Sequence, residues 1–281
     1  MRKLIFTILI AAGCLQAAAE RTVPFFDTSR PDKVIALGLR AGMNSSGVAT
    51  NYMDKQPELI QSNFYWHSGV QVGAIADLSI RKFLAIEVGL FWERHGYDAA
   101  MMAATAEEDY MGSQFTRVRY NDIHIPVLMS WRFNILPQAV WSVDLGPYFS
   151  YGLSGTKKAD SYIAFGEEDG QLVFDHNISN QKYFKADPKD FLAVNRFDAG
   201  LKVGTGLAFF SHYTISVYYQ RSVKNNAKDF DGGADYRLRN CSWSVNIGYN
   251  FWQHSFFNKK IYLNRHILFG IIFYRFSYDN S

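Results

Sequence analysis

Apolar and polar residues alternate with a period of two along eight segments of the chain, and this pattern restricts the fold more than any other feature. Successive side chains of a β-strand point to opposite faces, so the pattern predicts strands whose two faces meet different surroundings. In residues 120–133, one face carries Ile123, Ile125, Val127, Met129, Trp131 and Phe133, and the other is mostly polar. The remaining segments are 34–44, 69–79, 83–95, 139–153, 197–209, 213–223 and 241–251.

The connections between these segments alternate strictly between long and short. They contain 24, 3, 24, 5, 43, 3 and 17 residues, as expected when one rim of a barrel has tight turns and the other has elaborated loops. Because the number of strands is even, the first and last run antiparallel and can pair, which removes the open edges. Residues 34–252 are therefore predicted to form an all-β fold, a closed eight-stranded antiparallel transmembrane β-barrel with short periplasmic turns and long extracellular loops.

The position of glycine indicates which face of each strand points inward. Glycines occur on the polar face of the strands, which suits the cramped interior of an eight-stranded barrel and leaves the large apolar residues facing lipid. They are Gly38, Gly42, Gly69, Gly73, Gly89, Gly146, Gly152, Gly200, Gly204, Gly206 and Gly248. A soluble exported ligand-binding barrel, with its apolar residues inside, is the alternative, since alternation alone does not identify the inner face.

The first residues have the pattern of an export signal. Arg2 and Lys3 precede an apolar stretch and the small residues Ala17, Ala18 and Ala19, which predicts a signal peptide over residues 1–19 and a short periplasmic segment over residues 20–33. The alternative is a lipoprotein signal with Cys14 as the lipidated residue. Cleavage after Ala19 would leave Cys241 as the one cysteine, and a single cysteine closes no intramolecular disulfide.

Composition excludes several classes of protein. A mean hydropathy of −0.14, without an apolar run of the roughly 18 residues that a membrane helix needs, argues against a helical multispan protein. Beyond residue 19 the chain has 27 basic and 26 acidic residues, because Arg2 and Lys3 account for two of the 29 basic ones. Such a balance leaves no basic stripe for phosphates, so we expect no nucleic-acid partner.

Four motifs resemble the PorT-like outer membrane β-barrel domain family of Gram-negative envelopes. They are ALGLRAGMNSS, YNDIHIPVLMSWRF, DLGPYFSYGL and RFDAGLKVGTGLAF, within residues 34–252. The resemblance implies a porin-like outer membrane barrel surrounded by outer membrane lipid. For one branch of the family it also implies envelope or secretion-system partners and a part in protein secretion. The oligomeric state is not implied by any motif.

The tail, residues 253–281, departs from the family pattern, in which chains end soon after the last strand. Its apolar part, residues 267–276, resembles the closing strand of many outer membrane barrels. A ninth strand would spoil even closure. The preferred interpretation places the tail at the periplasmic rim, with a closing strand as the alternative.

Motifs for catalysis and cofactor binding are absent from the sequence: it contains no GxSxG, HExxH, CxxC or Walker loop. His124 and Asp122 share one strand face, as the residues of a lipid-modifying enzyme could, but no activated serine is identifiable, and an interior hydrogen-bonded histidine is the preferred interpretation. Glu167, Glu168 and Asp169 lack the spacing of a cation site and are interpreted as a solvated turn. Residues 101–104 are expected to form a short helix or mobile loop segment. We therefore expect no catalytic, cofactor-binding or metal site.

Four charged residues on the inward face are predicted to meet inside the barrel. Arg40, Glu87, Asp144 and Lys202 lie at similar distances from the turn end of their strands, and buried charges require partners. The predicted function is that of a noncatalytic outer membrane barrel that anchors, assembles or recognises through its extracellular loops. The alternatives are an outer membrane lipid-modifying enzyme and a soluble ligand-binding barrel.

Overall fold

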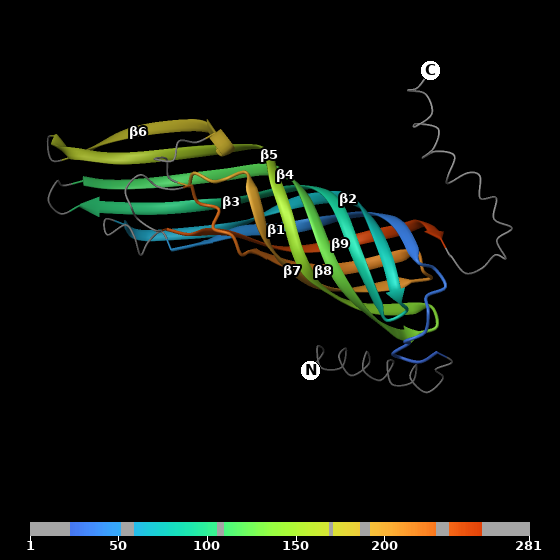
Figure 1. The fold of residues 1–281 in the computed structure, drawn as a ribbon. Helices are drawn as coiled ribbons and strands as arrows, with labels where there is room; N and C mark the ends of the chain where they lie inside the picture. The colour runs from blue at the N-terminus through green and yellow to red at the C-terminus, as the bar shows by residue number, and fades with distance from the viewer. Residues whose placement is uncertain are drawn as a thin grey trace, which may run out of the picture.

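The computed structural model describes residues 23–51, 59–105, 110–168, 171–185, 192–228 and 236–254 (Figure 1). These residues form the strands β1 Ile35–Thr50, β2 Leu59–Arg81, β3 Leu84–Thr105, β4 Tyr110–Leu136, β5 Ala139–Glu168, β6 Gln171–Lys182, β7 Phe197–Phe209, β8 Tyr213–Ser222 and β9 Leu238–His254, and the 3-10 helix η1 Tyr183–Lys185. In this part of the chain, no helix combines the length and the hydropathy that a membrane crossing requires.

Eight of the described strands form a closed antiparallel ring. Their order is β1, β2, β3, β4, β5, β7, β8 and β9, and β9 pairs back onto β1 from Ile35 opposite His254 to Thr50 opposite Leu238. Strand β6 lies outside the ring and pairs with β5. The predicted eight-stranded closed barrel is confirmed, and each of the eight alternating segments overlaps one strand of the ring.

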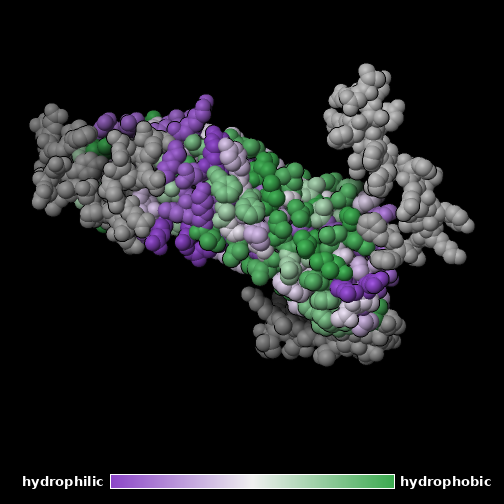
Figure 2. Space-filling view, viewed as in Figure 1, coloured by the Kyte–Doolittle hydropathy of each residue, from purple (hydrophilic) through white to green (hydrophobic). Residues whose placement is uncertain are grey.

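Side chains of the ring strands alternate between the outer surface and the lumen, which is the interior of the ring. On β7, Leu201 and Val203 are 54% and 45% exposed, whereas Lys202 between them is 2% exposed. Val88 and Ile247 are exposed in the same way. On the face of the molecule drawn in Figure 2, hydrophobic residues gather over the barrel; we call this zone of the outer wall the hydrophobic belt. The apolar face of the strands is therefore on the outside, as predicted.

Glycine permits large inward side chains to fill the lumen. A Cβ atom on Gly200 would lie 2.6 Å from Cε1 of Tyr148, and a Cβ atom on Gly204 would overlap the ring of Tyr218. Both tyrosines are buried. The interior of an eight-stranded ring is just wide enough for side chains, and here these side chains occupy it.

Strands β2, β3, β4 and β5 continue beyond the hydrophobic belt and, with β6, form a projecting sheet (Figure 1). Residues 101–104 belong to β3, and Met101 pairs with Gln114 of β4, so the predicted helix or mobile segment is wrong. The 43-residue connection contains the rest of β5 and all of β6, so this predicted long loop is largely a paired extension of the sheet. The side chains of Glu167 and Glu168, and all of Asp169, lie outside the described residues.

The N-terminal segment packs against the barrel wall near the end with the short turns. The ring of Phe25 stacks on Phe133 at 5.1 Å between centroids, and Phe26 contacts Phe83 at 4.5 Å. The backbone N–H of Asn134 donates to the carbonyl of Phe25 at 2.9 Å. The predicted signal peptide, residues 1–19 including Cys14, and the tail beyond residue 254 lie outside the described residues.

Candidate functional site

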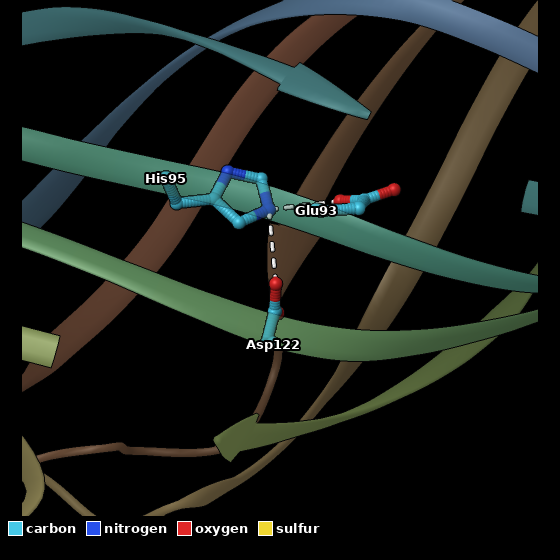
Figure 3. Close-up of side chains that lie close together, drawn as sticks. All are labelled: Glu93, His95 and Asp122. Carbon is cyan, nitrogen blue, oxygen red and sulfur yellow. Dashed lines mark hydrogen bonds and ion pairs between the residues drawn. The ribbon is translucent and has the colours of Figure 1, made fainter. Parts of the chain in front are cut away.

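Strands β3 and β4 bring three ionisable side chains together in the lumen. Glu93 and His95 are two residues apart on β3 and share its inward face, and the register sets Glu93 opposite Asp122 of β4. All three side chains are buried. His95 Nε2 lies 2.8 Å from Glu93 Oε2 and 3.6 Å from Asp122 Oδ1 (Figure 3). The imidazole therefore bridges two carboxylates, and we call these three residues the lumen cluster.

His124 and Lys202 extend the lumen cluster toward the turn end. His124 Nε2 lies 3.4 Å from Lys202 Nζ, and His124 Nδ1 lies 4.0 Å from Glu93 Oε2. Lys202 Nζ lies 4.0 Å from Glu93 Oε1. Among the described residues, no serine hydroxyl hydrogen-bonds to His124. The histidine singled out in the sequence is thus part of a buried charge network and has no nucleophile beside it.

The four predicted lumen residues lie close to one another. Arg40, Glu87 and Lys202 line a cavity of about 10 Å³ together with Tyr218. Tyr218 donates a hydrogen bond to Asp144 Oδ2 at 3.1 Å, and its ring lies 5.2 Å from Lys202 Nζ. The tyrosine thus connects Asp144 to the other three residues. Whether these charges are energetically coupled stays a prediction.

The sequence interpretation missed four charged residues of the lumen. Glu93 and His95 are at the centre of the lumen cluster, and Arg132 forms an ion pair with Asp77 near the turn end. The signal for the first two was present, because Glu93 and His95 follow Glu87 in steps of two along β3 and so share its face. The partner of each charge required the register between strands, which the sequence pattern does not supply.

The mouth of the lumen on the side of the projecting sheet is closed by aromatic and aliphatic side chains. Tyr97 and Tyr183 contact each other through their hydroxyl groups at 3.1 Å, and the Tyr183 ring stacks on Tyr120 at 5.4 Å between centroids. Burial raises the pKa of Tyr183, so the phenol stays neutral. Leu192, Val194, Tyr236 and Leu238 complete this group, which we call the cap.

A small cavity of about 30 Å³ separates the lumen cluster from the cap. His95, Asp122 and Asp198 line it, and Ser222 donates a hydrogen bond to Asp198 Oδ2 at 2.6 Å. This volume accommodates water and is far smaller than the pocket of a drug-sized ligand. The described lumen therefore offers no site for an organic substrate.

The lumen cluster has the donor types of a metal site. Imidazole and carboxylate groups bind divalent metals, and the ligand atoms of Glu93, His95 and Asp122 all lie within 4.8 Å of one another. A protonated His95 balances the same two carboxylates without a metal, and Lys202 adds a further positive charge beside Glu93. The geometry favours a buried charge network, with cation binding as the alternative.

Comparisons with solved structures identify several outer membrane proteins that are similar to this chain. OprG from Pseudomonas aeruginosa is 11% identical with a TM-score of 0.39, and the match covers 80% of this chain and 99% of OprG. Ail of Yersinia pestis, in complex with the heparin analogue sucrose octasulfate, is 13% identical with a TM-score of 0.32, covering 78% and 99%. Neisserial surface protein A is 10% identical with a TM-score of 0.29, covering 76% and 97%.

Sequence comparison identifies the family. No curated protein matches the chain. The family described as outer membrane protein beta-barrel domain matches residues 22–228, which is most of the chain and includes β1 to β8. This match is to a general outer membrane family, so the PorT-like assignment stays a proposal. The chain belongs to the outer membrane protein beta-barrel domain family and is an integral protein of the Gram-negative outer membrane.

Proposed function

We propose that this protein is a noncatalytic outer membrane barrel that recognises a partner protein through its projecting extracellular sheet. The observation that carries the proposal is the continuation of β2 to β5 beyond the hydrophobic belt, with β6 added at the side. In the sheet order of the described strands, β6 is at the end and pairs with β5. An edge strand presents unpaired N–H and C=O groups, which suit the addition of an extended segment of another protein.

The filled lumen supports recognition over transport. The cap closes one mouth, and the lumen cluster and the charged residues around Tyr218 occupy the interior below it. A transported solute would have to displace paired charges, which is costly in a narrow barrel. A protein partner would therefore be met by a surface outside the lumen, and the extracellular sheet extends farthest beyond the hydrophobic belt.

The PorT-like motifs suggest which partners to examine first. If the resemblance extends to function, the partner is an envelope or secretion-system protein, and the barrel anchors or assembles it. Export requires a signal, and we propose that residues 1–19 supply it by cleavage after Ala19. N-terminal sequencing of the mature protein distinguishes this from lipidation at Cys14. The tail, residues 253–281, is proposed to lie at the periplasmic rim.

Site-specific photo-crosslinking in intact cells tests the recognition surface. Ile178 on β6 is 69% exposed, and Ile247 on β9 is 65% exposed within the hydrophobic belt, so the two isoleucines form a matched pair. A photoreactive residue at position 178 should give a discrete protein adduct on denaturing gels, whereas position 247 should label lipid. Position 178 giving no protein adduct would contradict the proposal. Altered lipid acylation after gene deletion, reversed by the wild-type chain but not by His124→Ala, would instead support an enzyme.

A further inference from the structure

A groove on the outer wall of the barrel collects basic side chains above the hydrophobic belt. It encloses about 490 Å³ and is lined by residues of β3, β4, β5, β6 and η1. Its cations are Arg94, Arg119, Lys182, Lys185 and Arg196. Among the described residues that line this groove, none is acidic. The basic groove, as we call it, is therefore a concentrated positive surface on a chain whose overall charge is nearly balanced.

Strand register places the basic groove at a definite level of the wall. A row of cross-strand neighbours runs from Gly96 through Arg119 and Thr156 to Lys182. The row next to it, nearer to the belt, runs from Arg94 through Asn121 to Ser154, and Asn121 donates a hydrogen bond from Nδ2 to Ser154 Oγ at 3.1 Å. These residues share the outer face of the sheet, so their cationic groups are presented together.

An aromatic and aliphatic row lies two residues closer to the turn end on the same outer face. Trp92, Ile123, Tyr151 and Phe197 are successive cross-strand neighbours in this row. Trp92 and Tyr151 are exposed, as is Leu153 at the edge of the groove. Aromatic girdles mark the interface between acyl chains and headgroups around outer membrane barrels. The basic groove therefore lies at the level of the outer-leaflet headgroups, and Figure 2 shows a hydrophilic band directly beyond the belt.

The cations of the groove are largely without carboxylate partners in the described part of the chain. Arg119 forms an ion pair with Asp98 at 2.7 Å, and the other four cations form no ion pair with a described residue. Arg196 is held in place by hydrogen bonds from Nη1 to the carbonyls of Gly152 and Leu153 at 2.7 and 3.1 Å. Its guanidinium also lies 5.3 Å from the centroid of the Phe184 ring. A guanidinium held in place, with further N–H groups available, can donate two parallel hydrogen bonds to the oxygens of an anion such as phosphate.

We propose that the basic groove binds the phosphate headgroup of a phosphorylated glycolipid of the outer leaflet. The cations provide the charge complement, and the exposed row of Trp92 and Tyr151 provides contact with the acyl chains below it. A free anion in solution would use the cations but not the apolar row. This proposal does not depend on a protein partner, so it can fail while the recognition function stands.

Native mass spectrometry of the folded full-length protein in detergent measures the binding directly. The probes are diphosphoryl lipid A, monophosphoryl lipid A and phosphatidylethanolamine. The test variant combines Arg94→Gln, Lys182→Gln and Lys185→Gln, all of which are exposed in the groove. The matched control combines Arg117→Gln, Lys158→Gln and Arg221→Gln, which are exposed cations outside it.

The test variant should retain about tenfold less diphosphoryl lipid A than the wild type, because each of the three exposed cations contributes a factor of about two. The control variant should bind like the wild type, and phosphatidylethanolamine should not distinguish the three proteins. Equal losses in both variants would mean that the effect follows total charge, and equal retention by the test variant and the wild type would mean that the groove is not used. Either result overturns the proposal.

Two further measurements complete the test. A large molar excess of inorganic phosphate should leave diphosphoryl lipid A bound. Full displacement would show that the groove binds a free anion and would overturn the proposal that it binds a glycolipid. A photoreactive residue at Ser154, on the wall of the groove, should label lipid A in vesicles, and the same residue at Ile178, farther from the belt on β6, should not. This labelling needs no loss-of-charge variant, so it decides the question even if the triple substitution impairs folding.

Discussion

The two faces of β7 give a direct test of the barrel, because neighbouring positions should respond to one substitution in opposite ways. Val203 is 45% exposed in the hydrophobic belt, so Val203→Leu adds a methylene group to a surface that meets lipid. At Gly204, a Cβ atom would overlap the ring of Tyr218, and Gly204→Leu requires this ring to move. We expect the first substitution to be tolerated and the second to be strongly destabilising.

The magnitude follows from the contacts of Tyr218. Overpacking a filled interior costs about 1 to 3 kcal/mol. Moving the ring also breaks the 3.1 Å hydrogen bond to Asp144, and a buried polar group left without its partner costs about 1 to 3 kcal/mol. Gly204→Leu should therefore reduce the free energy of unfolding by about 2 to 6 kcal/mol. Val203→Leu should change it by less than about 0.5 kcal/mol.

Urea unfolding in lipid vesicles, followed by tryptophan fluorescence, measures both changes. Val203→Arg serves as a control, since an arginine facing lipid near the midplane should cost about 2 to 4 kcal/mol. Altered gel mobility without boiling confirms that each variant folds before unfolding is measured. A tolerated leucine at position 204 together with a destabilising one at position 203 would refute the assignment of faces.

Three other predictions concern the lumen. Planar-bilayer recording of the folded protein should show no stable large conductance, because side chains fill the ring, and reproducible porin-sized steps would contradict this. Double-mutant cycles of Glu87→Gln with Arg40→Met, and of Asp144→Asn with Lys202→Met, should show non-additive changes in the free energy of unfolding. The cycle of Asp77→Asn with Arg132→Met is the positive control, because these two residues form an ion pair. Strict additivity in both test cycles would show that the charges do not interact. His95→Phe should lower the free energy of unfolding by about 3 to 5 kcal/mol, because it leaves Glu93 and Asp122 without the imidazole that bridges them. A chelator should not change the unfolding midpoint of the wild type. A large drop in this midpoint with chelator would show that the lumen cluster holds a metal.

The ring could be predicted from the sequence because lipid on one face of each strand and the lumen on the other impose a period of two on the side chains. Within the ring, each side chain faces either lipid or the crowded lumen, so outward residues such as Leu201 and Val203 are apolar and the inward Lys202 between them is charged. In the projecting sheet, hydropathy does not distinguish the two faces in this way, although Ala99 and Met101 are buried on one of them. Residues 99–104 read AAMMAA, a run without alternation, and β3 nevertheless continues through them because β4 pairs alongside.

The candidate site was predictable only in part, for a related reason. Alternation predicts which charges point inward, and Arg40 and Lys202 on the predicted inward face are both buried. Neighbours across strands depend on the stagger between strands, which is a property of the closed ring as a whole. Glu93 opposite Asp122, with His95 bridging them, follows from this stagger and from no spacing within either strand.

The pairing of β1 with β9 also determines the order of events in biogenesis. Ile35 and His254 become neighbours only when the last strand has been delivered, so no earlier portion of the chain can form the finished wall. Until then both terminal strands have free edges, and the intermediate is prone to pair with other chains. Because the entropic cost of bringing the two strands together precedes the contacts that offset it, we expect ring closure to come late in folding. Closure of the ring therefore requires β1 to keep one edge unpaired until β9 arrives beside it.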